Sequence, residues 1–177
     1  TPVVIPGKPL TPFSIGGADF SWELIRAAND VVDLDKHFAA ADFAAAYALA
    51  EIRSEKETKT FLGVGSDDGI RIWHNGKLIH DNWAPRGVTK DQDLVPITLQ
   101  AGSNQILLKV QDILGEWGFV VRIVGKDALS DRLISATSVG DMEQINLLLE
   151  AGVSLDHSNK SGLTALANAR LHGRDDV

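Results

Sequence analysis

The centre of the chain reads Gly65-Ser66-Asp67-Asp68-Gly69-Ile70-Arg71-Ile72-Trp73-His74-Asn75-Gly76-Lys77-Leu78-Ile79-His80-Asp81-Asn82-Trp83. Apolar and polar residues alternate over 70–74, which is the period of a half-buried strand. Asp68-Gly69 and Asn75-Gly76 are typical of tight hairpin loops, because these residue types readily adopt positive φ. We therefore expect a turn at each dipeptide and a hairpin whose second strand covers 78–83.

Further strands are expected on both sides of this hairpin. They cover 20–26, 47–53, 59–64, 93–99, 105–110 and 117–124. About eight short strands separated by turn signals are typical of an all-β sandwich or barrel. The first 19 residues hold four of the six prolines and predict an extended lead-in. An alanine-rich run at 39–46 favours a short helix.

The pattern changes after Gly125, where apolar residues recur at helical spacing over 127–150. Ser130 or Asp131 is expected to cap a first helix and Asp141 a second, with Gly152 as a stop. A shift of 33 residues aligns three pairs of positions in this region. The pairs are Leu133 with Leu166, Ala136 with Ala169, and Gly140 with Gly173.

Composition excludes several classes of function. The 177 residues carry a net charge of −7 and no basic stripe, which argues against nucleic acid or an anionic membrane as partner. There is no cysteine, so disulfides and thiolate zinc sites are excluded. No apolar run approaches the ~20 residues that span a bilayer. No catalytic motif is present either, and we expect no enzyme activity from this chain.

The sequence also carries two family resemblances. Residues 46–124 resemble the galactose-binding-like jelly roll found beside secreted bacterial glycosidases, with a partial likeness to the protective-antigen-type sugar-binding domain. The likeness rests on Ala46-Tyr47-Ala48, Gly65-Ser66-Asp67-Asp68-Gly69, Trp73-x-Asn75-Gly76, Asp93, Asn104-x-x-Leu107-Leu108-Lys109-Val110 and Trp117-Gly118-Phe119. Residues 128–177 resemble ankyrin repeats through the 33-residue period and the run Gly162-Leu163-Thr164-Ala165-Leu166.

The expected architecture is mainly β with a C-terminal α segment. It consists of an extended lead-in over 1–19, a jelly-roll β-sandwich over 20–125 and ankyrin-type helix pairs over 126–177. The ankyrin segment ends at Val177 within an expected helix.

The jelly-roll resemblance implies a calcium ion held by two consecutive aspartates, here Asp67 and Asp68. Carboxylates on a turn supply the hard oxygen ligands that calcium prefers, but the same two residues could simply cap and form the turn. Trp83 is the best candidate to stack on a sugar, because aromatic rings pack well on the apolar faces of sugars. Arg86, Asn82 and His80 are the other ligand-binding candidates, with Arg86 able to donate two hydrogen bonds to hydroxyls or a uronate.

Three functions remain open at this point. The first is a non-catalytic module of a larger, secreted or periplasmic bacterial protein that binds a glycan or braces a catalytic domain. The second is a protein-interaction adaptor that uses the ankyrin segment. The third is a fragment of a hydrolase whose active site lies outside this chain.

Overall fold

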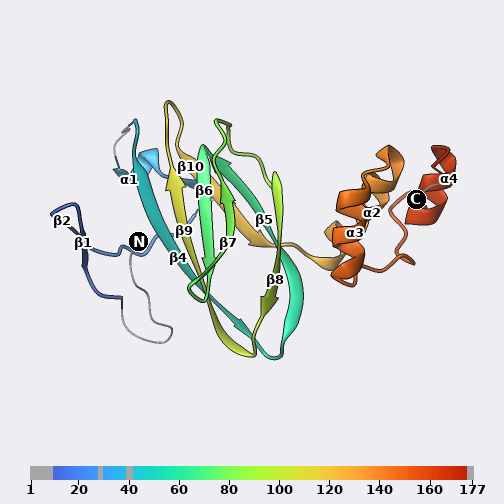
Figure 1. Ribbon diagram of the computed structural model, residues 1–177, viewed down its shortest axis with the longest axis horizontal. Helices are drawn as coiled ribbons and strands as arrows, with labels where there is room; N and C mark the ends of the chain where they lie inside the picture. Colours follow the sequence, from blue (N-terminus) through green and yellow to red (C-terminus); the bar gives the residue numbers. More distant parts are fainter. Residues whose placement is uncertain (1–9, 28–29, 39–41, 175–177) are drawn as a thin grey trace. The chain divides into compact units, whose positions relative to one another are not determined.

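A computed structural model describes residues 10–27, 30–38 and 42–174 (Figure 1). The described chain forms two compact units. One unit covers the residues up to Thr58 together with Leu62–Arg122. The other covers Lys59–Phe61 and the chain from Ile123 onward.

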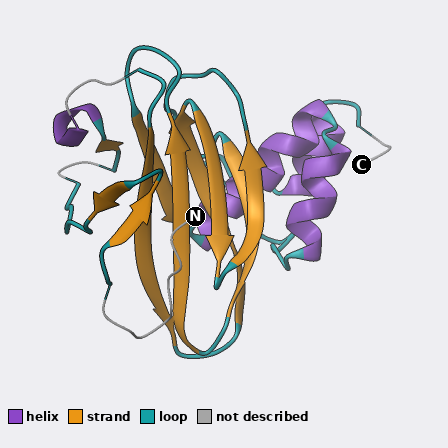
Figure 2. Cartoon of the chain, turned by 60° about the vertical axis from the view of Figure 1, so that its left-hand side comes forward, coloured by secondary structure: helices purple, strands orange, loops and turns teal. Residues whose placement is uncertain are grey.

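Two antiparallel four-stranded sheets form the first unit, and Figure 2 shows their strands in orange. One sheet has the order β3-β10-β5-β8 and the other β4-β9-β6-β7. The strands are β3 (Val32–Asp33), β4 (Ala45–Ser54), β5 (Thr58–Asp67), β6 (Gly69–His74), β7 (Lys77–Asn82), β8 (Asp93–Leu99), β9 (Gly102–Gln111) and β10 (Gly118–Ile123). A short helix, α1 (Asp35–Phe38), follows β3. The expectation of a mainly β fold with a β-sandwich is therefore confirmed.

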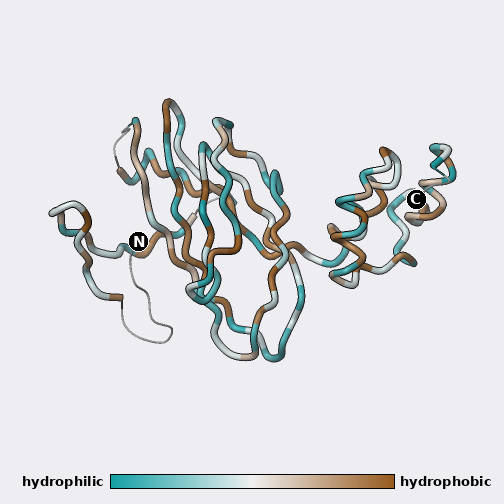
Figure 3. The backbone as a smooth tube through the Cα atoms, in the orientation of Figure 1, coloured by the Kyte–Doolittle hydropathy of each residue, from teal (hydrophilic) through white to brown (hydrophobic). Residues whose placement is uncertain are grey.

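The core of the sandwich consists of aliphatic side chains from both sheets. Along the strands, hydrophobic and hydrophilic residues alternate, as Figure 3 shows in brown and teal. Leu62 and Val64 of β5 and Ile70 and Ile72 of β6 are each at most 1% exposed. Full burial of such a side chain contributes about 1.5–3 kcal/mol, so this alternation is what holds the two sheets face to face.

Three connections that cross between the sheets position the functional region. The chain passes from β5 to β6 at residues 67–69, from β7 to β8 through 83–92, and from β9 to β10 through 112–117. Gly69 pairs with Gln111 in the β6/β9 ladder, and the Asp68 amide donates to the Gln111 carbonyl at 2.9 Å. The first and third of these connections therefore meet at one end of the sandwich.

Most of the expected strands are confirmed, and Asn75-Gly76 forms a tight turn with φ of 49° and 83°. The hairpin expected at Asp68-Gly69 is wrong, because β5 and β6 lie in different sheets. Gly69 does not have positive φ. Its lack of a side chain matters for another reason, since a Cβ there would lie 2.5 Å from the Trp83 ring.

The strand expected over 20–26 is also wrong. The structure instead has a hairpin of β1 (Phe13–Ile15) and β2 (Ala18–Phe20), which replaces part of the extended lead-in. Phe13 stacks on Phe20 at 5.6 Å and contacts Trp22 at 5.4 Å between ring centroids. The rest of the lead-in, residues 1–9, and residues 39–41 of the alanine-rich run lie outside the described residues. Ala45 and Ala46, expected in a helix, begin β4.

The second unit contains α2 (Lys126–Val139), α3 (Met142–Glu150) and α4 (Ala165–Leu171). Gly125 caps α2 in place of the expected Ser130 or Asp131, whereas Asp141 caps α3 as expected. None of the helices in the described residues is long and apolar enough to cross a membrane.

The 33-residue shift relates real structural features of the second unit. The Ala136 carbonyl accepts from the Asp141 amide at 3.1 Å, and the Ala169 carbonyl accepts from the Arg174 amide at 2.9 Å. Gly140 and Gly173 both adopt positive φ, at 71° and 65°. The two helix ends are therefore built alike. The ankyrin assignment itself stays a prediction.

Candidate functional site

Three buried carboxylates gather where the sheet-crossing connections meet. Asp67 ends β5, Asp68 follows it through a cis peptide bond, and Asp112 comes directly after β9. One oxygen from each lies within 4.8 Å of the other two. Their exposed fractions are 8%, 6% and 4%, so water solvates none of them well.

Few hydrogen-bond donors compensate this cluster. Asp68 is held by two backbone amides, from Arg86 at 3.0 Å and Ile113 at 2.7 Å. Asp112 Oδ1 is buried and has no partner in the part of the chain that the structure describes. Three adjacent carboxylates with so few donors are electrostatically unfavourable unless a cation or protons join them.

The pKa values of the cluster reflect this imbalance. Burial raises the pKa of Asp67 to about 6, and the neighbouring charges of Asp68 and Asp112 contribute to this rise. Burial also raises the pKa of Asp112, with the charge of Asp68 adding to the effect. Both shifts have the causes expected for carboxylates that lack counter-charges.

The cluster meets the geometric requirement of a calcium site. Oxygens bound to one calcium at about 2.3–2.6 Å lie at most about 5.2 Å apart, and the three carboxylates satisfy this limit. The sequence pointed to Asp67 and Asp68 but missed Asp112. The signal for Asp112 is that it directly follows a strand whose end pairs with Gly69, a register that only the folded sandwich defines.

The other sequence candidates gather on a different carboxylate. Asp93, the first residue of β8, receives Arg86 through two hydrogen bonds of 3.1 and 2.6 Å. Asn82 donates to it at 3.2 Å, and His80 Nε2 lies 3.1 Å from it. Burial raises the pKa of Asp93, but its hydrogen bonds and the Arg86 charge together outweigh burial and lower that pKa below its usual value.

Arg86 connects the two clusters. Its guanidinium donates to Ser66 Oγ at 3.0 Å, and Ser66 Oγ donates to the Asp68 carbonyl at 2.7 Å. Its backbone amide donates to the Asp68 carboxylate. With its side chain only 18% exposed, Arg86 fixes the 83–92 connection against Asp68.

Exposed apolar side chains lie beside the carboxylates. Trp83 is 58% exposed and contacts Gly69. Phe43 is 77% exposed and adopts φ of 58°, which is strained for a bulky residue. Its amide donates to the Ile113 carbonyl at 3.3 Å, next to Asp112. Sequence reasoning identified Trp83 but missed Phe43, because no local pattern marks an exposed aromatic residue in a loop.

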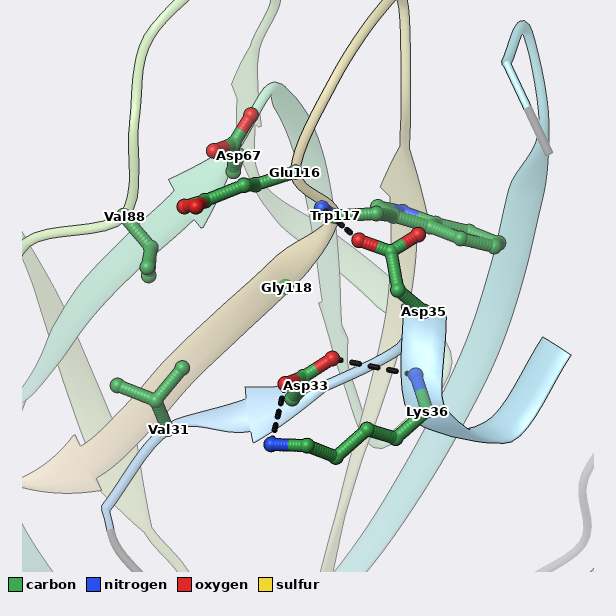
Figure 4. Close-up of a pocket in the computed structure, with 9 residues that line it drawn as sticks. All are labelled: Val31, Asp33, Asp35, Lys36, Asp67, Val88, Glu116, Trp117 and Gly118. Carbon is green, nitrogen blue, oxygen red and sulfur yellow. Dashed lines mark hydrogen bonds and ion pairs between the residues drawn. The ribbon is translucent and has the colours of Figure 1, made fainter. Parts of the chain in front are cut away.

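A pocket of about 430 Å³ opens beside Asp67 (Figure 4). Its charged lining residues are Asp33, Asp35, Lys36, Asp67 and Glu116, and Val31, Val88, Trp117 and Gly118 complete the lining. Carboxylates therefore outnumber cations four to one. Trp117 is 4% exposed, and its indole N–H has no acceptor among the described residues.

No protein-family model matches the chain, and neither does any curated protein. Among solved structures, the chain is similar to the PA14 domain of the antifreeze protein MpAFP, with 17% identity over 45% of this chain and 42% of that chain and a TM-score of 0.39. It is similar to the β-glucosidase of Kluyveromyces marxianus solved with glucose, with 12% identity over 62% of this chain and 15% of that chain and a TM-score of 0.43. For the α-xylosidase of Xanthomonas citri, the identity is 13% over 44% of this chain and 9% of that chain, with a TM-score of 0.33. The chain thus spans less than half the length of each.

Proposed function

We propose that the sandwich is a non-catalytic module that binds glycans through a calcium ion held by Asp67, Asp68 and Asp112. The observation that carries this proposal is the buried, unpartnered Oδ1 of Asp112 beside two further buried carboxylates. A bound calcium would compensate the three charges and would need about 6–8 oxygen ligands. Sugar hydroxyls are suitable oxygens for the positions that the protein leaves open.

The exposed aromatic residues supply the second half of a sugar site. Trp83 and Phe43 both belong to loops beside the carboxylates and leave most of their ring surface in water. Stacking on the apolar face of a sugar would remove part of this surface from water. His80, Asn82 and Arg86 support this site from below, because Asp93 and Asp68 already engage their hydrogen-bonding groups.

The proposal includes a setting for the module. It belongs to a larger, secreted or periplasmic bacterial protein, in which it brings a neighbouring domain to a glycan. Support for this setting comes from the jelly-roll resemblance and from the absence of cysteine.

A glycan-array screen in calcium and again in chelator tests the binding function. We expect calcium-dependent binding that Asp112→Asn abolishes and Trp83→Ala weakens at least tenfold. Asp81→Asn is the matched control, because it removes a carboxylate from an exposed ion pair with Arg71 on the same sheet. Glycan binding that survives both chelator and Asp112→Asn would overturn the calcium site.

The second unit supports an adaptor as a second candidate function. Leu133 is 1% exposed, yet Leu166, which stands 33 residues later, is 53% exposed. Leu171 on the same helix is 68% exposed. If these helices are ankyrin-type pairs, this face would take a protein partner. Loss of such a partner in Leu166→Glu, with glycan binding retained, would establish this function.

A further inference from the structure

The pocket beside Asp67 is large enough for a sugar residue and is built from three separate segments. Residues 31–36 form one wall, Asp67 and Val88 another, and residues 116–118 a third. In Figure 4, Asp67 and Glu116 lie on one side of the pocket, and Asp33 and Lys36 lie on the other. Its volume of about 430 Å³ is within the range of small-molecule sites.

Negative charge dominates this pocket even when its one cation is counted. The ammonium of Lys36 lies 2.7 Å from the Asp33 carboxylate, and its side chain is 78% exposed. Asp35 accepts a hydrogen bond from the Trp117 amide at 2.9 Å, which leaves its charge in place. Glu116 is exposed and adds a further carboxylate. The lining therefore keeps a negative excess after Asp33 and Lys36 cancel.

Asp67 is an independent indication that the pocket takes a ligand. Its side chain lines the pocket, yet the residue is only 8% exposed. Among the described residues, none donates a hydrogen bond to its carboxylate. A buried carboxylate without donors that faces an open pocket attracts a cationic group and repels an anionic one.

The remaining lining suits an organic cation better than a bare ion. Val31, Val88 and Trp117 contribute apolar surface beside the carboxylates. A sugar with an amino group has the matching chemistry, since its C–H face packs on apolar side chains and its ammonium pairs with carboxylates. A uronate or sulfated sugar would instead meet like charges.

We infer that this pocket selects glycans carrying a free, protonated amine, with Glu116, Asp35 and Asp67 facing the ammonium group. The inference rests on the proposed glycan-binding function and names the substrate class of that site. Asp67 faces both the calcium ligands and the pocket, so the two parts of the ligand would bind next to each other.

The test compares two ligands that differ only at the nitrogen. Binding of glucosamine oligomers and of N-acetylglucosamine oligomers of equal length is measured by calorimetry, in calcium and at a mildly acidic pH where the amine is protonated. We expect at least tenfold tighter binding of the free-amine oligomer, with the difference falling in high salt because salt screens charges.

Two variants assign the preference to the pocket. Glu116→Gln removes an exposed pocket carboxylate and is expected to reduce the preference about tenfold. Glu57→Gln removes an exposed carboxylate from the turn before β5 and should keep the preference. Retention of the preference in Glu116→Gln, or its equal loss in Glu57→Gln, would overturn the inference.

The outcomes separate this inference from the proposed function. Calcium-dependent binding of both oligomers with equal affinity would overturn the amine preference and leave the glycan function standing. A preference that persists unchanged in chelator and in Asp112→Asn would remove the calcium mechanism and leave the pocket. No binding of either oligomer, on a protein that also fails on the glycan array, would overturn both.

Discussion

Asp93 and the Asp67, Asp68 and Asp112 cluster are linked through Arg86 but differ in their surroundings. Asp93 receives hydrogen bonds from Arg86 and Asn82, and its pKa is lowered. The three-carboxylate cluster has few donors, and the pKa values of Asp67 and Asp112 are raised. A carboxylate that is fully paired within the protein stabilises the fold, whereas a cluster left unpaired is suited to an external cation. The direction of the pKa shift thus separates structural from functional carboxylates.

The largest effect is expected from breaking the paired cluster. Asp93→Asn leaves the guanidinium of Arg86 mostly buried without its counter-charge, because that side chain is only 18% exposed. We expect a loss of about 2–4 kcal/mol in the free energy of unfolding, measured by urea denaturation in chelator. Asp81→Asn breaks the exposed ion pair with Arg71 instead and should cost less than about 1 kcal/mol. Equal losses in the two variants would show that the Asp93 cluster is not structural.

A smaller, opposite effect is expected from filling the unpaired cluster. Calcium at about a hundred times its dissociation constant should raise the free energy of unfolding by about 2.7 kcal/mol, because it binds only the folded state. Thermal unfolding with and without calcium measures this gain. Asp112→Asn should abolish it, whereas Asp81→Asn should retain it. A wild-type protein that calcium does not stabilise at any concentration would contradict the calcium site.

Local patterns predicted the strands well but not the way they connect. Alternation over β6 and β9 is visible in the sequence, because a half-buried strand repeats every two residues. Asn75-Gly76 and Asp68-Gly69 carry the same local signal, yet only the first forms a hairpin. Which sheet a strand joins depends on pairing with distant strands, such as Gly69 with Gln111, and no dipeptide encodes that.

The candidate site was predicted in part for the same reason. The consecutive aspartates Asp67 and Asp68 are adjacent in sequence and could be identified, whereas Asp112 joins them only through the β6/β9 register. The role of Arg86 also depends on folding, since its partner Asp93 and its contact Asp68 come from opposite sides of it in sequence. Residue type alone suggested a sugar ligand, but burial and pairing show a support for the 83–92 connection.

The smallest effect is expected from removing a single charge from the unpaired cluster. The folded-state pKa of Asp67 is raised from 3.8 to about 6, so the folded state holds this proton more tightly than the unfolded state. The carboxylate therefore destabilises the calcium-free fold above its unfolded pKa, and this penalty grows until the pH passes about 6. A shift of about two units corresponds to roughly 3 kcal/mol at most.

Asp67→Asn should recover part of this penalty, because asparagine carries no charge but still buries a polar group. We expect the variant to be about 1–2 kcal/mol more stable than the wild type at neutral pH in chelator, and the gain to vanish at about pH 4, where the wild-type carboxylate is protonated. Urea denaturation at both pH values measures the difference. In calcium the sign should reverse, since the variant lacks a ligand. A variant that is less stable than the wild type in chelator at neutral pH would mean that Asp67 is paired in the fold, which would erase its contrast with Asp93.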